Sequence, residues 1–181
     1  MQEDLLEIIL DKDQLAAGVA RLGATLAADY AGQTPLLVGV LKGAVIFLSD
    51  LIRAMDIPLR YDFMAVSSYG AATKSTGQVQ ILKDLGQSIE GQAVILVEDI
   101  VDTGLTLSYL VENLRARRPK SLKVCTLLDK PSRRLVEIKP DYNGFEIPDK
   151  FVVGYGLDFA DKYRNLPYIG VLKPEMYENG G

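Results

Sequence analysis

The residues from Val94 to Leu107, V-I-L-V-E-D-I-V-D-T-G-L-T-L, predict a strand, a polar turn and a helix in direct succession. The apolar run Val94–Val97 is typical of a strand buried in a parallel sheet. The turn from Asp102 to Thr106 is small and polar and contains a glycine, and an amphipathic pattern follows it. Because the free N–H groups and the positive dipole end of a helix N-terminus attract anions, this turn indicates a phosphate site.

Two carboxylates, Glu98 and Asp99, stand between this strand and the turn. Acids beside an anion site indicate a ligand that carries hydroxyls as well as a phosphate, as a sugar phosphate does. Since successive side chains of a strand point to opposite faces, both acids can contact one ligand only if the strand ends or twists near Val97. We therefore predict that the strand stops there, at the sheet edge where ligands of open parallel sheets bind. The alternative is an ordinary strand–loop–helix joint with solvated acids.

Composition narrows the function classes. The 181 residues suffice for one domain with its own core. Twenty Lys and Arg against 24 Asp and Glu give a net charge of −4, which argues against a general nucleic-acid binder. Without histidine, acid–base chemistry falls to carboxylates and lysines. The acidic start and the lack of a long apolar run predict neither a secretory signal nor a membrane span, and the single Cys125 is expected to be buried in a protein of the reducing cytoplasm.

Strand and helix patterns alternate along the chain, which predicts an α/β fold with a parallel sheet. The expected strands are Glu7–Leu10, Leu36–Leu41, Leu59–Val66, Val79–Leu82, Leu122–Leu128 and Phe151–Val153. The expected helices run from Asp11 or Asp13 to about Tyr30, from about Ala44 to Met55, and from the signature turn to near Arg117. The small, polar stretch from Ser67 to Gln78 predicts a mobile loop at a hairpin tip. No repeat or linker interrupts the pattern, so a single domain over residues 1–181 is expected.

The signature resembles the diphosphosugar-binding motif of purine phosphoribosyltransferases, in which two neighbouring acids and a third acid three residues later precede Thr-Gly-x-Thr. The resemblance extends over nearly the whole chain to the hypoxanthine-guanine phosphoribosyltransferases, most closely to the bacterial type. It implies the type I phosphoribosyltransferase fold: a central parallel sheet flanked by helices, with a small hood from the terminal segments and a flexible lid loop. In this family Glu98 and Asp99 would hold the ribose hydroxyls, and Asp102 would lie beside N7 of the purine as the catalytic base. The 5′-phosphate would be bound by the turn, Asp102, Thr103, Gly104, Leu105 and Thr106.

Further motifs extend the resemblance to the diphosphate and to a lid. Lys42 and Gly43 resemble the family's diphosphate loop, where a non-proline cis peptide often precedes the lysine. Ser68 and Tyr69 resemble the tip of the catalytic lid, which would keep water away from an oxocarbenium-like ribose. Arg164 would clamp the diphosphate with its planar fork of donors. Taken singly, each of these residues has an ordinary structural alternative, and their order along the chain is what favours the site.

The remaining motifs concern the purine and the metal. Lys130, just past a predicted strand, would donate to the purine O6, because a cation favours a 6-oxo acceptor and rejects the 6-amino group of adenine. Phe151 would stack on the base, and Val152 would read its edge through backbone groups. Asp158 would help to hold Mg²⁺ on the diphosphate, since magnesium is usually bound by few carboxylates together with substrate oxygens and water. Glu98 and Asp99 are the other candidate metal ligands.

The resemblance implies an enzyme of purine salvage. It would transfer the phosphoribosyl group of 5-phosphoribosyl diphosphate (PRPP) to N9 of hypoxanthine, and of guanine, giving IMP or GMP and diphosphate. We expect Mg²⁺ as cofactor and a cytoplasmic homodimer or homotetramer, with no membrane or nucleic-acid partner. One departure is Leu105, where some members have lysine; it should leave the backbone site intact and weaken phosphate affinity somewhat. A transferase for guanine or xanthine, and a PRPP-binding regulator that contacts nucleic acid, are the alternatives.

Overall fold

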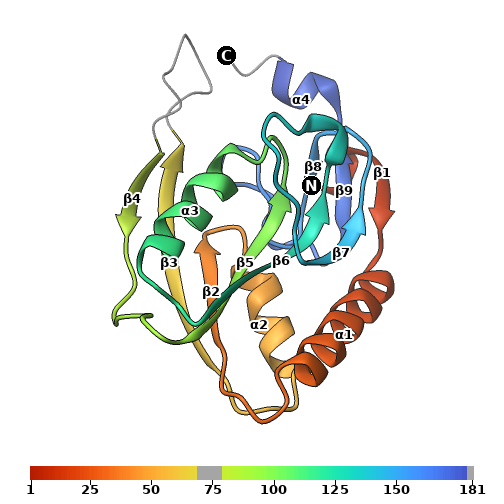
Figure 1. Cartoon of the computed structure of the whole chain (residues 1–181). Coiled ribbons are helices and arrows are strands. Elements are labelled where there is room, and N and C mark those ends of the chain that lie inside the picture. Colours follow the sequence, from red (N-terminus) through yellow and green to blue (C-terminus); the bar gives the residue numbers. More distant parts are fainter. Residues whose placement is uncertain (69–78, 179–181) are drawn as a thin grey trace.

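A six-stranded sheet forms the centre of the molecule, in a computed structural model that describes residues 1–68 and 79–178 (Figure 1). The strand order is β4-β3-β2-β5-β6-β7, and every neighbouring pair is parallel except β3 and β4. The strands are β2 Leu36–Leu41, β3 Arg60–Ser68, β4 Val79–Lys83, β5 Ala93–Val101, β6 Ser121–Asp129 and β7 Tyr142–Glu146. The predicted parallel α/β sheet and the β3–β4 hairpin are thereby confirmed.

Helices cover both faces of this sheet. The helices are α1 Lys12–Asp29, α2 Val45–Ala54, α3 Leu105–Ala116 and the short α4 Pro174–Glu178, with 3₁₀ turns at Gln2–Asp4 and Pro131–Arg133. Within β5, Ile95 and Val97 pack with residues of α1 and α2, while Val94 and Leu96 pack with residues of α3. Burial on both faces is why β5 reads as a continuous apolar run rather than an alternating one.

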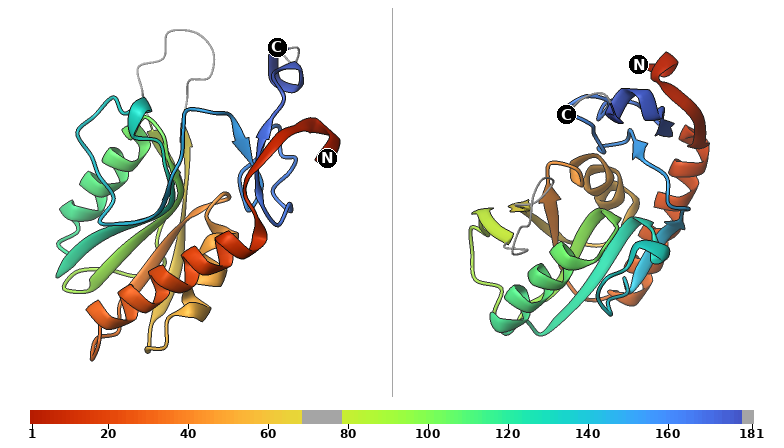
Figure 2. Two further views of the ribbon diagram at one scale, coloured as in Figure 1. Left: turned by 90° about the vertical axis from the view of Figure 1, so that its right-hand side faces the viewer. Right: turned by 90° about the horizontal axis from the view of Figure 1, so that it is seen from above.

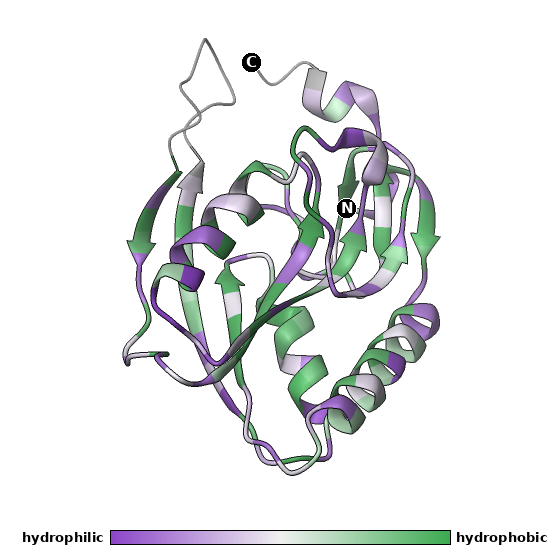
Figure 3. Cartoon of the chain, in the orientation of Figure 1, coloured by the Kyte–Doolittle hydropathy of each residue, from purple (hydrophilic) through white to green (hydrophobic). Residues whose placement is uncertain are grey.

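Hydropathy follows this layering. Figure 3 shows β2 and most of β5 as hydrophobic, whereas α1 mixes both colours because only one of its sides is buried. The predicted cap of α1 is confirmed at Asp11, whose carboxylate accepts the N–H of Gln14 at 2.8 Å while the Gln14 side chain accepts the N–H of Asp11 at 2.9 Å. No helix in residues 1–68 and 79–178 has the length and apolarity needed to cross a membrane.

A second, three-stranded sheet is built from both ends of the described chain. Its strands are β1 Leu5–Leu10, β9 Ile169–Leu172 and β8 Val152–Val153, in the order β1-β9-β8 and all antiparallel. Figure 2 shows this sheet beside the central one, with both ends of the described chain, residues 1–4 and α4, on its side of the molecule. It corresponds to the hood that was expected from the terminal segments.

Two predicted boundaries are wrong. β5 does not stop at Val97 but runs to Val101, because β6 continues to pair with it after its pairing with β2 ends at Val97. The ladder with β6 keeps the same register from Ala93 to Val101, so β5 continues past Val97 without a register shift. β3 likewise extends through Ser68, where a loop was expected to have begun at Ser67, since β4 pairs with it up to that residue.

Candidate active site

The signature turn encloses a cavity of about 200 Å³ at the carboxyl end of β5. Gly104 is the residue before α3 and has a φ of +85°, a conformation that glycine adopts without steric cost. The exposed Leu105 opens the helix, and its N–H lies 3.4 Å from Oγ1 of Thr103. The predicted phosphate-binding residues that line the cavity are Asp102, Thr103, Gly104 and Thr106, joined by Glu98. The structure therefore brings the expected phosphate turn around one hollow at a helix N-terminus.

The two neighbouring acids occupy different sides of β5. Glu98 is 7% exposed and lines the cavity of the turn. The carboxylate of Asp99 lies against the predicted diphosphate loop, where a Cβ added to Gly43 would come within 1.8 Å of its Oδ2. A side chain at position 43 would therefore force this carboxylate to move. The acids thus face the phosphate turn and the diphosphate loop separately, as the alternation of a continued strand requires.

Both acids are more readily protonated than exposed carboxyls. Burial raises the pKa of Glu98 well above its ordinary value, and the charge of Asp99 raises it further. Burial also raises the pKa of Asp99, to about 6; Arg164 opposes this rise and the charge of Asp158 adds to it. The oxygens of these two carboxylates are buried and have little positive charge nearby. A hard cation bound to them would supply that charge.

The predicted diphosphate residues meet beside Asp99. The peptide bond between Leu41 and Lys42 is cis, as the resemblance implied, and Nζ of Lys42 lies 3.1 Å from Oδ1 of Asp161. Gly156 packs on the same loop, since a Cβ there would lie 2.1 Å from the main-chain oxygen of Gly43. The loop is therefore held between β5 and the segment that follows β8.

Arg164 belongs to this segment. One of its guanidinium nitrogens donates to the main-chain oxygen of Gly156 at 2.7 Å, and another lies 2.8 Å from Oδ1 of Asp158. Its Nε is buried without a partner among the described residues. A buried donor with no acceptor is costly in a protein interior, so an acceptor from a ligand would be favourable there.

The predicted purine residues lie just past the end of β6, at Lys130, and at the start of β8, at Phe151 and Val152. Lys130 is 6% exposed and donates through Nζ to the main-chain oxygen of Lys150 at 2.6 Å. Burial lowers the pKa of Lys130, and Asp102 opposes this effect. The side chain of Val152 is in the core, so only its backbone remains for a ligand.

Phe151 already has an aromatic partner. Its ring is 40% exposed and stacks on Tyr177 of α4 with centroids 4.8 Å apart and an interplanar angle of 22°. Phe159 contacts the Phe151 ring edge to face at 5.7 Å. Sequence reasoning did not identify Tyr177, because no local pattern indicates which ring a C-terminal helix will meet.

Sequence reasoning also missed Arg133 and Arg134. Nε of Arg133 lies 3.1 Å from Oδ1 of Asp102, and Arg134 forms a buried ion pair with Asp129. Two adjacent arginines shortly after Lys130, which follows a predicted strand end, were the signal that could have indicated a role near the site.

Other candidate residues give less direct information. Tyr69 lies outside the described residues, and Ser68 is the last residue of β3. Among residues 1–68 and 79–178, no three acidic or cysteine side chains are grouped closely enough to hold a metal ion. Glu98, Asp99 and Asp158 therefore suit a magnesium ion that is bound largely by substrate oxygens and water. Cys125 is buried, as predicted.

Comparison with known proteins places the chain in a family. The family described as "Phosphoribosyl transferase domain" matches residues 6–160. The chain is 55% identical over 179 residues to the hypoxanthine-guanine phosphoribosyltransferase of Bacillus subtilis (strain 168), covering 99% of each. It is 52% identical to the protein of that name from Staphylococcus aureus (strain Mu50), over 99% of this chain and 100% of that one. A crystal structure of a hypoxanthine phosphoribosyltransferase from Staphylococcus aureus matches with a TM-score of 0.95 at 52% identity, over 99% of this chain and 97% of that one. The chain belongs to the phosphoribosyltransferase family.

Proposed function

We propose that the chain transfers the phosphoribosyl group of PRPP to N9 of hypoxanthine, and of guanine, in purine salvage. The observation that carries this proposal is the arrangement around the carboxyl end of β5. There the phosphate turn lies against Glu98, the diphosphate loop lies against Asp99, and the buried Lys130 directly follows the neighbouring strand β6. Relatives named for this reaction match the chain over nearly its full length.

PRPP would lie across the end of β5. The N–H groups and hydroxyls of Thr103–Thr106 bind its 5′-phosphate, and Lys42 and Arg164 bind its diphosphate. Glu98 and Asp99 hold the ribose hydroxyls and, with Asp158, would hold Mg²⁺. When bound, this ion supplies charge neutralisation for the leaving diphosphate. The raised pKa of Asp99 supports such a role, because a bound cation would offset the cost of its buried charge.

The purine would lie between Lys130 and Phe151. Lys130 donates to O6, Val152 reads the base edge through its backbone, and Phe151 stacks on the base with the part of its ring that Tyr177 leaves exposed. The bond from ribose C1 to the diphosphate oxygen breaks as N9 attacks C1 from the opposite face. Asp102, beside N7, accepts the purine proton.

Asp102 must first be released from its ion pair. In the ligand-free arrangement Arg133 contacts the Asp102 carboxylate. The Arg133 side chain is 47% exposed, so the contact is solvated and its opening costs little. Binding of the purine replaces this contact with one to N7.

A spectrophotometric assay tests the reaction. Purified protein receives PRPP and Mg²⁺ together with hypoxanthine, guanine, xanthine or adenine in turn. Turnover of a 6-oxopurine with adenine inert is the expected result, because Lys130 offers only donors to the 6-position. Lack of turnover with all four bases would contradict the proposal, and equal use of adenine would contradict the role of Lys130.

The proposal also covers the domain organisation, the cofactor, the cellular location and the oligomeric state. The whole chain acts as one phosphoribosyltransferase domain with Mg²⁺, as a cytoplasmic homodimer or homotetramer. Light scattering on the purified protein measures the oligomer directly. The regulator alternative has no support from the named relatives, and a net charge of −4 does not favour nucleic acid.

A further inference from the structure

The segment after β6 holds the main-chain oxygens that lead into the phosphate turn. Three successive main-chain oxygens, from the last residue of β5 into the turn, accept hydrogen bonds from this one segment, so the contact is continuous rather than a single bridge. The pairs are Val101 with the N–H of Lys130 at 2.9 Å, Asp102 with Nη1 of Arg134 at 2.6 Å, and Thr103 with the N–H of Leu135 at 2.9 Å.

These bonds orient the opposite side of the turn. In a trans peptide unit the C=O and the next N–H point in opposite directions. The N–H groups of Asp102, Thr103 and Gly104 are therefore turned away from the segment and toward the side of the cavity, which these residues line. Within the described part of the chain, the N–H groups of Thr103 and Gly104 have no acceptor. Successive free N–H groups of this kind form an anion-binding concavity.

Only one of the three bonds comes from a side chain, that of Arg134. This side chain is 13% exposed, and its other nitrogen pairs with the buried Asp129 at the end of β6. A Cβ added to Gly104 would lie 3.0 Å from Cδ of Arg134, so the arginine also packs against the back of the turn. The planar guanidinium thus reaches two fixed oxygens from one buried position.

We infer that Arg134 is a positioning residue of the phosphate subsite: it holds the main-chain oxygen of Asp102 so that the N–H of Thr103 faces the 5′-phosphate. This inference rests on the proposed function, because it assigns the ligand of the turn. Arg134 contacts no reacting atom and acts through the turn alone. Its loss should therefore weaken recognition of the phosphate and leave recognition of the base and ribose nearly unchanged.

Two variants separate this role from a general structural one. Arg134→Gln removes the guanidinium. Arg134→Lys keeps a positive charge beside Asp129, so the buried acid retains a counter-ion and the fold is expected to persist. A single ammonium cannot span both oxygens as the guanidinium does.

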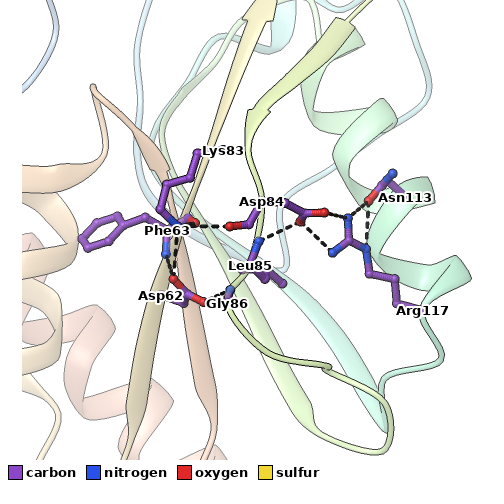
Figure 4. Close-up of polar contacts among 8 residues, drawn as sticks. All are labelled: Asp62, Phe63, Lys83, Asp84, Leu85, Gly86, Asn113 and Arg117. Carbon is purple, nitrogen blue, oxygen red and sulfur yellow. Dashed lines mark hydrogen bonds and ion pairs between the residues drawn. The ribbon is translucent and has the colours of Figure 1, made fainter.

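Arg117→Gln is the matched control. Arg117 is also a partly buried arginine that joins two elements. It pairs with Asp84 at 2.7 Å and donates to Oδ1 of Asn113 at 2.7 Å (Figure 4). It directly follows α3, whose 12 residues place it about 18 Å along the helix from the phosphate turn. Its loss should lower stability without a change at the turn.

The experiment compares the affinities for IMP and inosine, which differ only in the phosphate, by isothermal titration calorimetry. We expect both Arg134 variants to raise the Kd for IMP, by about tenfold or more for Arg134→Gln and less for Arg134→Lys, as the loss of one charge-assisted hydrogen bond predicts. The Kd for inosine should change less than about twofold, and Arg117→Gln should change neither by more than about twofold.

Equal weakening of IMP and inosine would overturn the inference, because it would indicate general damage to the site. An unchanged affinity for IMP in both variants would overturn it as well. Failure of the proposed function would appear separately, as a lack of turnover by the unsubstituted protein with any purine base, which the binding measurement does not require.

Discussion

Two groups of acids, at the carboxyl end of β5 and at the base of the β3–β4 hairpin, have opposite electrostatic environments. Burial raises the pKa values of Glu98 and Asp99 at the site. Hydrogen bonds from Arg117 lower the pKa of Asp84. The pKa of Asp62 is lowered too: burial raises it, but the N–H groups of Gly86 and Phe63 and the charge of Lys83 outweigh that effect (Figure 4).

We propose that the difference separates carboxylates that stabilise the fold from carboxylates that serve a ligand. An acid with a lowered pKa is better satisfied in the folded state than in the unfolded one, so its ionisation favours folding. An acid with a raised pKa costs stability when it is charged, and the cost is recovered when a ligand supplies the missing partner. The same substitution, acid to amide, should therefore have opposite consequences in the two groups.

Asp102→Asn should give the largest effect. The amide keeps the shape of the side chain but cannot accept the purine proton, so kcat should fall by ~10²–10⁴. Steady-state kinetics with hypoxanthine measures the change, with Asp84→Asn as the matched control. Full activity of the Asp102 variant would remove this residue from the acid–base step.

Lys130→Gln should have the next largest effect, and it extends the comparison of buried charged groups from carboxylates to a cation. Loss of a charged donor to O6 should lower kcat/KM for hypoxanthine by about 10–100-fold, the equivalent of one charge-assisted hydrogen bond. Competition by adenine, measured in the same assay, should become easier to detect. An unchanged preference for 6-oxopurines would show that the backbone alone reads the 6-position.

Asp99→Asn should raise the KM for PRPP by about tenfold and at the same time stabilise the ligand-free protein by at most roughly 3 kcal/mol, because it removes a costly buried charge. The sign follows from the pKa of about 6 in the folded protein against 3.8 ordinarily. The stability cost is complete above pH 6 and disappears as the pH falls toward 3.8. Denaturant titrations of both proteins should therefore differ at pH 7 and converge near pH 4. If the variant were less stable than the unsubstituted protein at pH 7, the ionised Asp99 would stabilise the fold, as Asp62 and Asp84 do.

Asp84→Asn should have the smallest effect. Its side chain is half exposed, so loss of the pair with Arg117 should cost at most about 1 kcal/mol of unfolding free energy and leave kcat unchanged. Because the folded pKa is lowered from 3.8, this contribution is present above pH 3.8 and is lost as the pH falls through the folded value. Thermal unfolding at pH 7 and at pH 3 provides the measurement. A larger loss at the acidic pH would contradict the assignment.

Local patterns predicted the elements that depend on their own residues. The strand Leu36–Leu41 was predicted at the residues where the structure has it, because an apolar run acts over a few positions. The cap of α1 was predicted at Asp11 or Asp13, and the structure has it at Asp11. β7 and β9 were missed. β7 is a half-exposed edge strand with a glycine at its centre, and β9 is four residues long, so neither has a strong pattern of its own.

The order of residues along the chain predicts the chemistry of the site, because the two acids, the glycine-containing turn and the lysine after the next strand stand in motifs that can be recognised without a structure. The length of β5 depends on its partner in the folded sheet, since β6 continues the ladder past Val97. Folding also brings the guanidinium of Arg134 to the main-chain oxygen of Asp102 and stacks Tyr177 on Phe151. These contacts join residues far apart along the chain, and their geometry depends on sheet pairing and helix docking, which no local pattern of residues encodes.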